Sequence, residues 1–185
     1  MNRKTVVIVS TSILAAMSLI LELYVHFPVL PSAPYMLYSP GDLPIIVAAL
    51  IFGPIPGMLT ALVNSVLFVL LTGEGGPWGA LMHFISSGGM AIVIGLMEKK
   101  FGKTHLSLLS GIVTRVALMI PANFLVTPIY TGLPVEVIAK MIVPVVIPFN
   151  IIHSGINSAL AYPLLKTMPK SITEKYRTKS GITEV

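Results

Sequence analysis

The stretch 42–71 reads DLPIIVAALIFGPIPGMLTALVNSVLFVLL and contains very few polar side chains. The segment Gly-Pro-Ile-Pro-Gly at 53–57 interrupts it, because proline and glycine end or kink a helix. The stretch therefore forms either one kinked membrane span or a tight hairpin of two short spans. This choice decides whether the chain crosses a membrane five times or six times.

The positions of lysine and arginine distinguish the two possibilities. These residues cluster at 3–4, at 99–103 and at 166–179, whereas the connections at 28–41 and 72–79 contain none. Positively charged segments next to membrane spans are retained in the cytoplasm. The hairpin alone places all three clusters on one face of the membrane. We therefore predict the hairpin, with both chain termini in the cytoplasm.

The composition is typical of an all-α integral membrane protein. The 185-residue chain is 55% hydrophobic and 10% charged, with a mean hydropathy of +0.90, whereas about a quarter of the residues in soluble domains are charged. The net charge of +5 comes mostly from cations at the ends of apolar segments, so membrane topology explains it and no nucleic-acid partner is expected. The chain has no cysteine, which excludes disulfides, thiolate metal sites and a cysteine nucleophile.

We predict a single membrane domain of six transmembrane helices, because each apolar segment is long enough for one span or for half of the hairpin. The predicted spans are 5–27, 42–53, 57–72, 78–97, 105–127 and 141–165. The predicted outer loops are 28–41, 72–79 and 128–140, and a cytoplasmic tail follows at 166–185.

Sequence patterns for catalysis are weak. The Gly-Lys-Thr at 102–104 is similar to the end of a phosphate-binding loop, but Met97 stands where that motif needs glycine. Ser86 and His153 lie on different spans, as in an intramembrane serine protease, yet no Gly-x-Ser-x-Gly surrounds the serine. The carboxylates and histidines are scattered singly, which argues against a metal site. We expect no enzymatic activity, no metal and no resident cofactor.

Polar side chains within the apolar segments gather in the outer half of the predicted membrane. His83, Asn123, Asn150 and His153 lie one to three turns from the outer ends of their spans. Such groups are costly in lipid, which favours a ligand-binding role, although each can instead hydrogen-bond a neighbouring helix. Arg115 lies deeper, and we expect it to face protein or water rather than lipid.

The outer loops at 28–41 and 128–140 offer apolar and aromatic surface that prolines hold in place. Together with the polar groups below them, they suit a planar apolar ligand with polar edges. The alternative is that their tyrosines form an interfacial belt with Trp78. The further candidate ligand-binding residues are Tyr35, Leu37, Tyr38, Pro128, Tyr130 and Phe149.

The first predicted helix carries small residues at helical spacing. Ser12, Ala15 and Ala16 contribute to a small-x-x-x-small surface, which lets a second helix approach closely. The sequence leaves two possibilities open, packing within this chain and packing against a partner protein.

Four segments carry a resemblance to a known family. They are YSPGDLP at 38–44, FGPIPG at 52–57, NFLVTPIY at 123–130 and IPFNII at 147–152. With the six predicted helices and the small residues of the first helix, they resemble the S components of energy-coupling factor (ECF) vitamin transporters, and most of all the riboflavin-specific type. The chain departs from that pattern at His153, where the family usually has lysine, and at Ser12, where it usually has alanine.

The resemblance implies a substrate-binding subunit of the plasma membrane of a prokaryote. Riboflavin would be captured from outside as the transported ligand, with Asn123, Asn150 and His153 at its polar edge. A transmembrane coupling protein and two cytoplasmic ATPases would be the partners and supply the nucleotide chemistry. An S component for thiamin or another small heterocycle is the alternative within this class, and an intramembrane enzyme or a passive channel is the alternative outside it.

Overall fold

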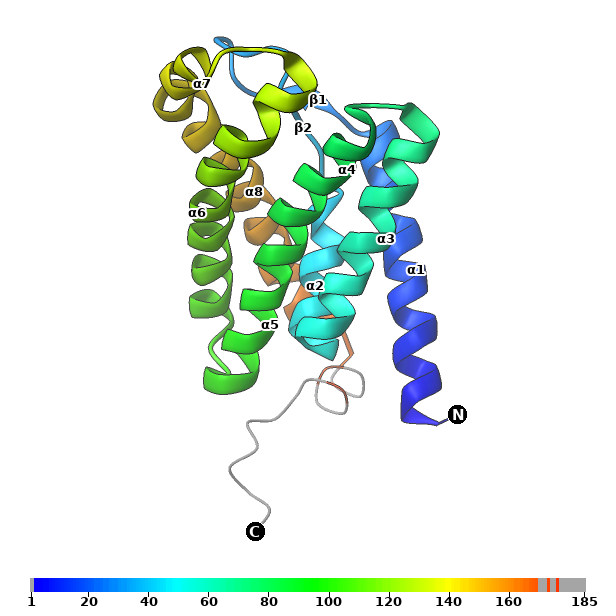
Figure 1. Cartoon of the computed structure of the whole chain (residues 1–185). Helices are drawn as coiled ribbons and strands as arrows, with labels where there is room; N and C mark the ends of the chain where they lie inside the picture. The colour runs from blue at the N-terminus through cyan, green and yellow to red at the C-terminus, as the bar shows by residue number, and fades with distance from the viewer. Residues whose placement is uncertain (1, 170–172, 174–175, 177–185) are drawn as a thin grey trace.

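Six apolar helical segments run side by side in the part of the chain that the computed structural model describes, residues 2–169, 173 and 176 (Figure 1). In chain order the elements are α1 (Arg3–Tyr24), β1 (Phe27–Pro28), β2 (Leu37–Tyr38), α2 (Asp42–Phe52), α3 (Pro54–Thr72), α4 (Gly76–His83), α5 (Gly89–Phe101), α6 (Thr104–Thr131), α7 (Val135–Met141) and α8 (Ile147–Thr167). Short π-helical segments, Phe84–Gly88 and Ile142–Val146, join α4 to α5 and α7 to α8. Within the described residues, five segments are long and apolar enough to cross a membrane, and α2 is a shorter apolar helix. The predicted fold class is confirmed.

The predicted hairpin is present, and Gly53 joins α2 to α3. Its φ of 100° lies in the region that favours glycine. Pro54 follows in the first turn of α3, where a missing N–H is tolerated. The two helices approach closely, since a Cβ added at Gly57 would lie 2.6 Å from the Cβ of Ala49. The glycines and prolines of this segment therefore reverse the chain and do not kink one long helix.

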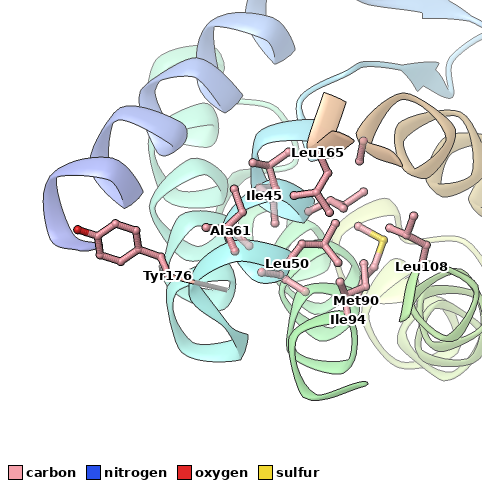
Figure 2. Packing of buried hydrophobic residues seen from close by; sticks show 14 residues of the cluster. Ile45, Leu50, Ala61, Met90, Ile94, Leu108, Leu165 and Tyr176 are labelled. Carbon is pink, nitrogen blue, oxygen red and sulfur yellow. The ribbon is translucent and has the colours of Figure 1, made fainter. Parts of the chain in front are cut away.

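Helix α2 forms the centre of the bundle and packs against α1, α3, α5 and α8. Every residue at 44–51 is buried, because apolar side chains surround the whole helix instead of one face. Leu50 of α2 belongs to one apolar cluster with Met90 and Ile94 of α5 (Figure 2). Full burial of a side chain of this size stabilises a fold by about 1.5–3 kcal/mol.

The N-terminus of α2 lies inside the bundle. Eleven residues of helix span about 16 Å, roughly half of the hydrocarbon thickness of a bilayer. The chain covers the remaining depth as the segment after β2, which enters the bundle from the outer end (Figure 1). Tyr38, Ser39 and Asp42 are buried along this segment. The outer loop predicted at 28–41 thus includes a part that lies within the protein.

The prediction of an outer loop at 128–140 is wrong, because most of this segment is helical. Helix α6 continues to Thr131, and α7 begins at Val135. Pro128 lies inside α6. Next to it, the Thr127 hydroxyl donates to Asn123 Oδ1 at 3.0 Å, so this polar side chain has its partner within the same helix. Membrane helices tolerate proline when nearby groups satisfy the backbone and side chains. The loop predicted at 72–79 is also shorter than expected, since α4 begins at Gly76.

The end of the bundle opposite the β1–β2 hairpin carries basic segments. The N-terminus and the turn between α5 and α6 lie at this same end, on opposite sides of the bundle (Figure 1), so the segment with Arg3 and Lys4 shares that end with the lysines at 99–103. This arrangement is the one that the predicted topology requires. Of the predicted tail at 166–185, residues 170–172, 174–175 and 177–185 lie outside the described part of the chain.

Candidate ligand-binding site

A cavity of about 490 Å³ lies at the outer end of the bundle, bordered by α1, the segment around β2, α3, α4 and α6. Its volume falls within the range of small-molecule sites in proteins. Its walls mix apolar and aromatic side chains with a few polar groups, as ligand pockets usually do. The lining residues are Glu22, Leu23, His26, Leu37, Ser39, Phe68, Val69, Thr72, Glu74, Gly75, Gly79, His83 and Tyr130.

The inner wall of the cavity is built around Glu22 of α1, which is only 6% exposed. Its Oε1 lies 2.6 Å from Nε2 of His83 on α4, and its Oε2 accepts a hydrogen bond from Asn64 Nδ2 on α3. The ring of Phe68 stacks on His83 with 5.6 Å between centroids. Both carboxylate oxygens therefore have a neighbour from another helix, which holds the side chain in one place.

The segment that enters the bundle passes directly over α1 at Gly41. Ser18 Oγ donates to the Gly41 carbonyl oxygen at 2.6 Å. A Cβ at position 41 would lie 3.0 Å from the Cβ of Glu22. Glycine is needed there because the backbone approaches α1 closely, and this approach places Ser39 at the cavity wall.

A second polar group, which we call the Asp42 network, consists of Asp42, Ser87, Arg115, Asn150 and His153. Asp42 accepts hydrogen bonds from Arg115 Nη1 and, at 2.6 Å, from Ser87 Oγ. Arg115 Nε donates to Asn150 Oδ1 at 3.0 Å, and His153 Nδ1 lies 3.3 Å from Asp42 Oδ2. The network joins α2, the π-helical segment after α4, α6 and α8.

Arg115 therefore faces protein, as the sequence predicted. It is 4% exposed and Asp42 is 2% exposed, so neither charge reaches lipid. Isolated charges are costly in such surroundings, whereas a hydrogen-bonded pair offsets much of that cost. The partner was not predictable from the sequence, because Asp42 and Arg115 lie 73 positions apart and no local pattern connects them.

The structure brings three of the predicted site residues to the cavity, namely Leu37, His83 and Tyr130. Tyr38 is buried beside them, and its hydroxyl has no hydrogen-bond partner among the described residues.

The predicted amide contacts are engaged within the protein. Asn150 accepts from Arg115, and its Nδ2 donates to the Val146 carbonyl oxygen at 2.8 Å. Asn123 Nδ2 donates to the Met119 carbonyl oxygen at 2.8 Å. Neither amide lines the cavity, so their role in ligand binding stays a prediction.

The remaining predicted residues surround the Asp42 network or the hairpin. The His153 ring lies between those of Tyr38 and Phe149, with centroids 5.3 and 5.4 Å away. Tyr35 is exposed beside β2, and Pro128 is half-buried on α6. His153, Phe149, Tyr35 and Pro128 do not line the cavity, so their contact with a ligand also stays a prediction.

Several cavity residues were not predicted, among them Glu22, His26, Phe68, Thr72 and Glu74. Glu22 did carry a usable signal, because an ionisable residue within an apolar span marks a functional position by default. Phe68 and Thr72 lie on α3, and His26 and Glu74 lie in the connections that follow α1 and α3, so their convergence depends on how these helices pack.

The small residues of α1 divide between two faces. Ser12 and Ala16 are exposed, together with Ile13 and Met17 on the same side of the helix. Ala15 is 4% exposed and packs inside the bundle, because consecutive helical residues point about 100° apart. Ala15 is therefore not available to a partner protein, and this part of the predicted partner surface is wrong.

The chain is similar to known proteins over nearly its whole length. The family model for the S component of ECF-type riboflavin transporters matches residues 2–170. The riboflavin transporter FmnP of Bacillus subtilis (strain 168) is 30% identical over 188 residues, which cover 95% of this chain and 96% of that protein. The riboflavin transporter RibU of Staphylococcus aureus (strain TCH60) is 29% identical over 169 residues, covering 85% and 87%.

A solved structure shows the same fold. The S component of a bacterial ECF transporter superposes with a TM-score of 0.75 over 89% of this chain and 95% of that one, at 23% sequence identity.

Proposed function

This chain belongs to the S components of ECF-type riboflavin transporters, and we propose that it captures riboflavin in the cavity at the outer end of the bundle. The observation that carries the proposal is the cavity itself, which lies next to the β1–β2 hairpin and away from the basic end of the molecule. A ligand arriving from outside reaches it without crossing the apolar core.

The chemistry of the cavity suits a flavin. Leu37, Phe68 and Tyr130 offer apolar and aromatic surface for a planar ring system. Glu22 and Thr72 offer oxygen acceptors for hydroxyl groups, such as those of a ribityl chain. This pairing of flat apolar walls with a few polar groups supports a ligand that has both parts.

The Asp42 network supports the site from below. Asn157 Nδ2 donates to the Ser39 carbonyl oxygen at 3.0 Å, which ties the entering segment to α8. Asp42 holds the next turn of the same segment against α6. Asn123, Asn150 and His153 do not line the cavity. We propose that they contact the polar edge of the flavin where the ligand extends from the cavity toward α6 and α8.

We propose that transport requires a transmembrane coupling protein and two cytoplasmic ATPases. The exposed face of α1 is the proposed contact surface, because the small residues Ser12 and Ala16 are exposed there beside the exposed apolar side chains of Ile13 and Met17. Small residues at this spacing allow close helix packing without a polar driving force. The ATPases would supply the phosphate chemistry for which this chain has no motif.

Titration of the purified chain in detergent with riboflavin tests the proposal. Binding should quench flavin fluorescence with a one-to-one end point, and excess thiamin should not compete. Mass spectrometry of the small molecule that copurifies provides an independent identification. Competition by thiamin, or a copurifying molecule without a flavin ring, would assign the chain to another vitamin.

A further inference from the structure

The turn between α5 and α6 carries three cations at the inner end of the bundle, opposite the β1–β2 hairpin. Lys99 and Lys100 lie in the last turn of α5, and Lys103 immediately precedes α6. We call these three residues the turn lysines. All of them are exposed, and none has a carboxylate partner within the described residues. Their charges are therefore available to a ligand at this surface.

The acidic residue of the same turn is buried and does not neutralise them. Glu98 is only 3% exposed. Its Oε1 accepts a hydrogen bond from Thr104 Oγ1 at 3.2 Å, and its Oε2 accepts one from Ser107 Oγ at 2.7 Å. Both carboxylate oxygens are thus engaged inside the protein. Among the described residues, the exposed charges at the turn are therefore all positive.

The backbone that carries the turn lysines is held in place by tight packing of α5 against α6. The two hydrogen bonds of Glu98 join the end of α5 to the first turn of α6. Farther from the turn, a Cβ added at Gly111 of α6 would lie 2.5 Å from Cγ1 of Ile94 on α5, so the helices are in close contact. A ligand that binds at a fixed turn orders less chain than one that binds at a flexible segment, and this favours a defined site.

Exposed apolar side chains lie next to the turn lysines. Phe101 is exposed, and Lys100 Nζ lies 5.1 Å from the centre of its ring. Farther from the turn, Leu96 of α5 and Leu109 of α6 are exposed as well. Both helices belong to segments that can cross a membrane, so these leucines meet acyl chains while the lysines lie at the level of the headgroups. Positive charge beside an apolar surface suits a molecule with an anionic head and an apolar tail.

We propose that the turn lysines bind the phosphate headgroup of an anionic lipid in the cytoplasmic leaflet. Membrane orientation explains why cations lie on this face, but it requires neither a buried carboxylate nor a rigid turn. An acidic protein surface is the alternative occupant. The lipid is favoured because the turn lies across the bundle from α1, the proposed contact surface for the coupling protein (Figure 1). The inference concerns a different end of the molecule from the cavity and does not depend on what the cavity binds.

Native mass spectrometry of the full chain, purified in detergent and titrated with lipid, tests the inference. Phosphatidylglycerol and phosphatidylcholine with the same acyl chains are compared, because they differ in the net charge of the headgroup. The measured quantity is the ratio of their dissociation constants for the first bound lipid. The turn variant combines Lys99→Gln, Lys100→Gln and Lys103→Gln. The matched control combines Arg3→Gln, Lys4→Gln and Lys166→Gln, which remove equal charge from the same end but outside the turn.

The unmodified chain should bind phosphatidylglycerol about tenfold more tightly than phosphatidylcholine, since each lysine near an anionic headgroup strengthens binding by up to about fivefold. The turn variant should lose most of this preference, and the matched control should keep it. A second variant, Lys99→Arg with Lys100→Arg and Lys103→Arg, should also keep the preference because it preserves the charge. The replaced side chains are exposed, so circular dichroism should show the same helical fold for all variants.

Three results overturn the inference. Equal binding of the two lipids by the unmodified chain would show that no headgroup charge is recognised. An equal loss of preference in the turn variant and the matched control would show that total charge matters and the turn does not. An unchanged lipid preference in the turn variant, together with loss of its assembly with the coupling protein and the ATPases, would assign the turn to an acidic protein surface.

A further arm separates a lipid headgroup from free phosphate. Phosphatidylglycerol binding is measured in sodium phosphate and in sodium chloride at equal ionic strength, so that screening is the same in both. The two salts should have the same effect, because the acyl chains contribute to binding. Stronger competition by phosphate than by chloride would assign the turn to the free anion and refute the lipid site.

Discussion

Removal of Arg115 should strongly destabilise the bundle. Arg115→Met removes the hydrogen bond from Arg115 to the buried Asp42 carboxylate. The carboxylate then keeps two neighbours, the Ser87 hydroxyl and the His153 ring. The substitution also removes the donor to Asn150 Oδ1. Loss of one partner of a buried ion pair typically costs about 3–5 kcal/mol. For a chain of this length each kcal/mol lowers the melting temperature by about 2–4 °C, so the expected fall is roughly 6–20 °C.

A double-mutant cycle separates the pair from its surroundings. Asp42→Asn should also destabilise the chain, because it leaves the Arg115 guanidinium without its carboxylate. The combination of Arg115→Met with Asp42→Asn should be less destabilising than the sum of the two single changes by about 2 kcal/mol or more. Thermal unfolding in detergent, followed by circular dichroism, measures all three variants. Lys140→Met, which removes an exposed cation on α7, is the matched control.

Unfolding of Arg115→Met at the same temperature as Lys140→Met would contradict this prediction. Simple addition of the effects of Arg115→Met and Asp42→Asn would also contradict it. Either result would mean that the Asp42 network does not hold α2, α6 and α8 together.

Three further predictions concern other parts of the molecule. Ala16→Trp should abolish transport in the assembled complex while riboflavin still binds, because Ala16 is exposed. Ala15→Trp should lose riboflavin binding through misfolding, because Ala15 packs inside the bundle. Transport and binding assays are made on both variants, and equal behaviour of the two would contradict this prediction. Asn123→Ala should weaken riboflavin binding about five- to 150-fold if its amide turns to the ligand, and an unchanged dissociation constant would remove it from the site. Gly57→Val should destabilise the chain by about 1–3 kcal/mol, since its Cβ would meet that of Ala49, and an unchanged melting temperature would show that the α2–α3 hairpin can separate there.

The arrangement of the membrane spans could be predicted because it depends on local properties of the chain. Apolar length identifies a span, and the distribution of lysine and arginine orients it. The choice of a hairpin at 53–57 followed from these two rules and agrees with the positive φ of Gly53. The inward direction of Arg115 was also predictable, because a cation within an apolar segment has no stable place in lipid.

The helical course of 128–140 was not predictable from the prolines alone. Pro128 and Pro134 indicate loop in a soluble chain, but Pro128 lies within α6 and Pro134 precedes the first residue of α7. In an apolar environment the backbone gains so much from internal hydrogen bonds that a helix continues past one missing N–H.

For the candidate site too, some features follow from local sequence and others from tertiary packing. The sequence by itself determined that this protein crosses a membrane with six helical segments, that polar groups gather in their outer half, and that Ser12 and Ala16 carry a close-packing pattern. Only the tertiary structure decided that Glu22 meets His83 and Asn64, that Asp42 meets Arg115, and that a cavity opens between α1, α3, α4 and α6. Spans and orientation arise from the interaction of each segment with lipid and water, whereas a cavity and its charge pairs arise where segments far apart in sequence pack together.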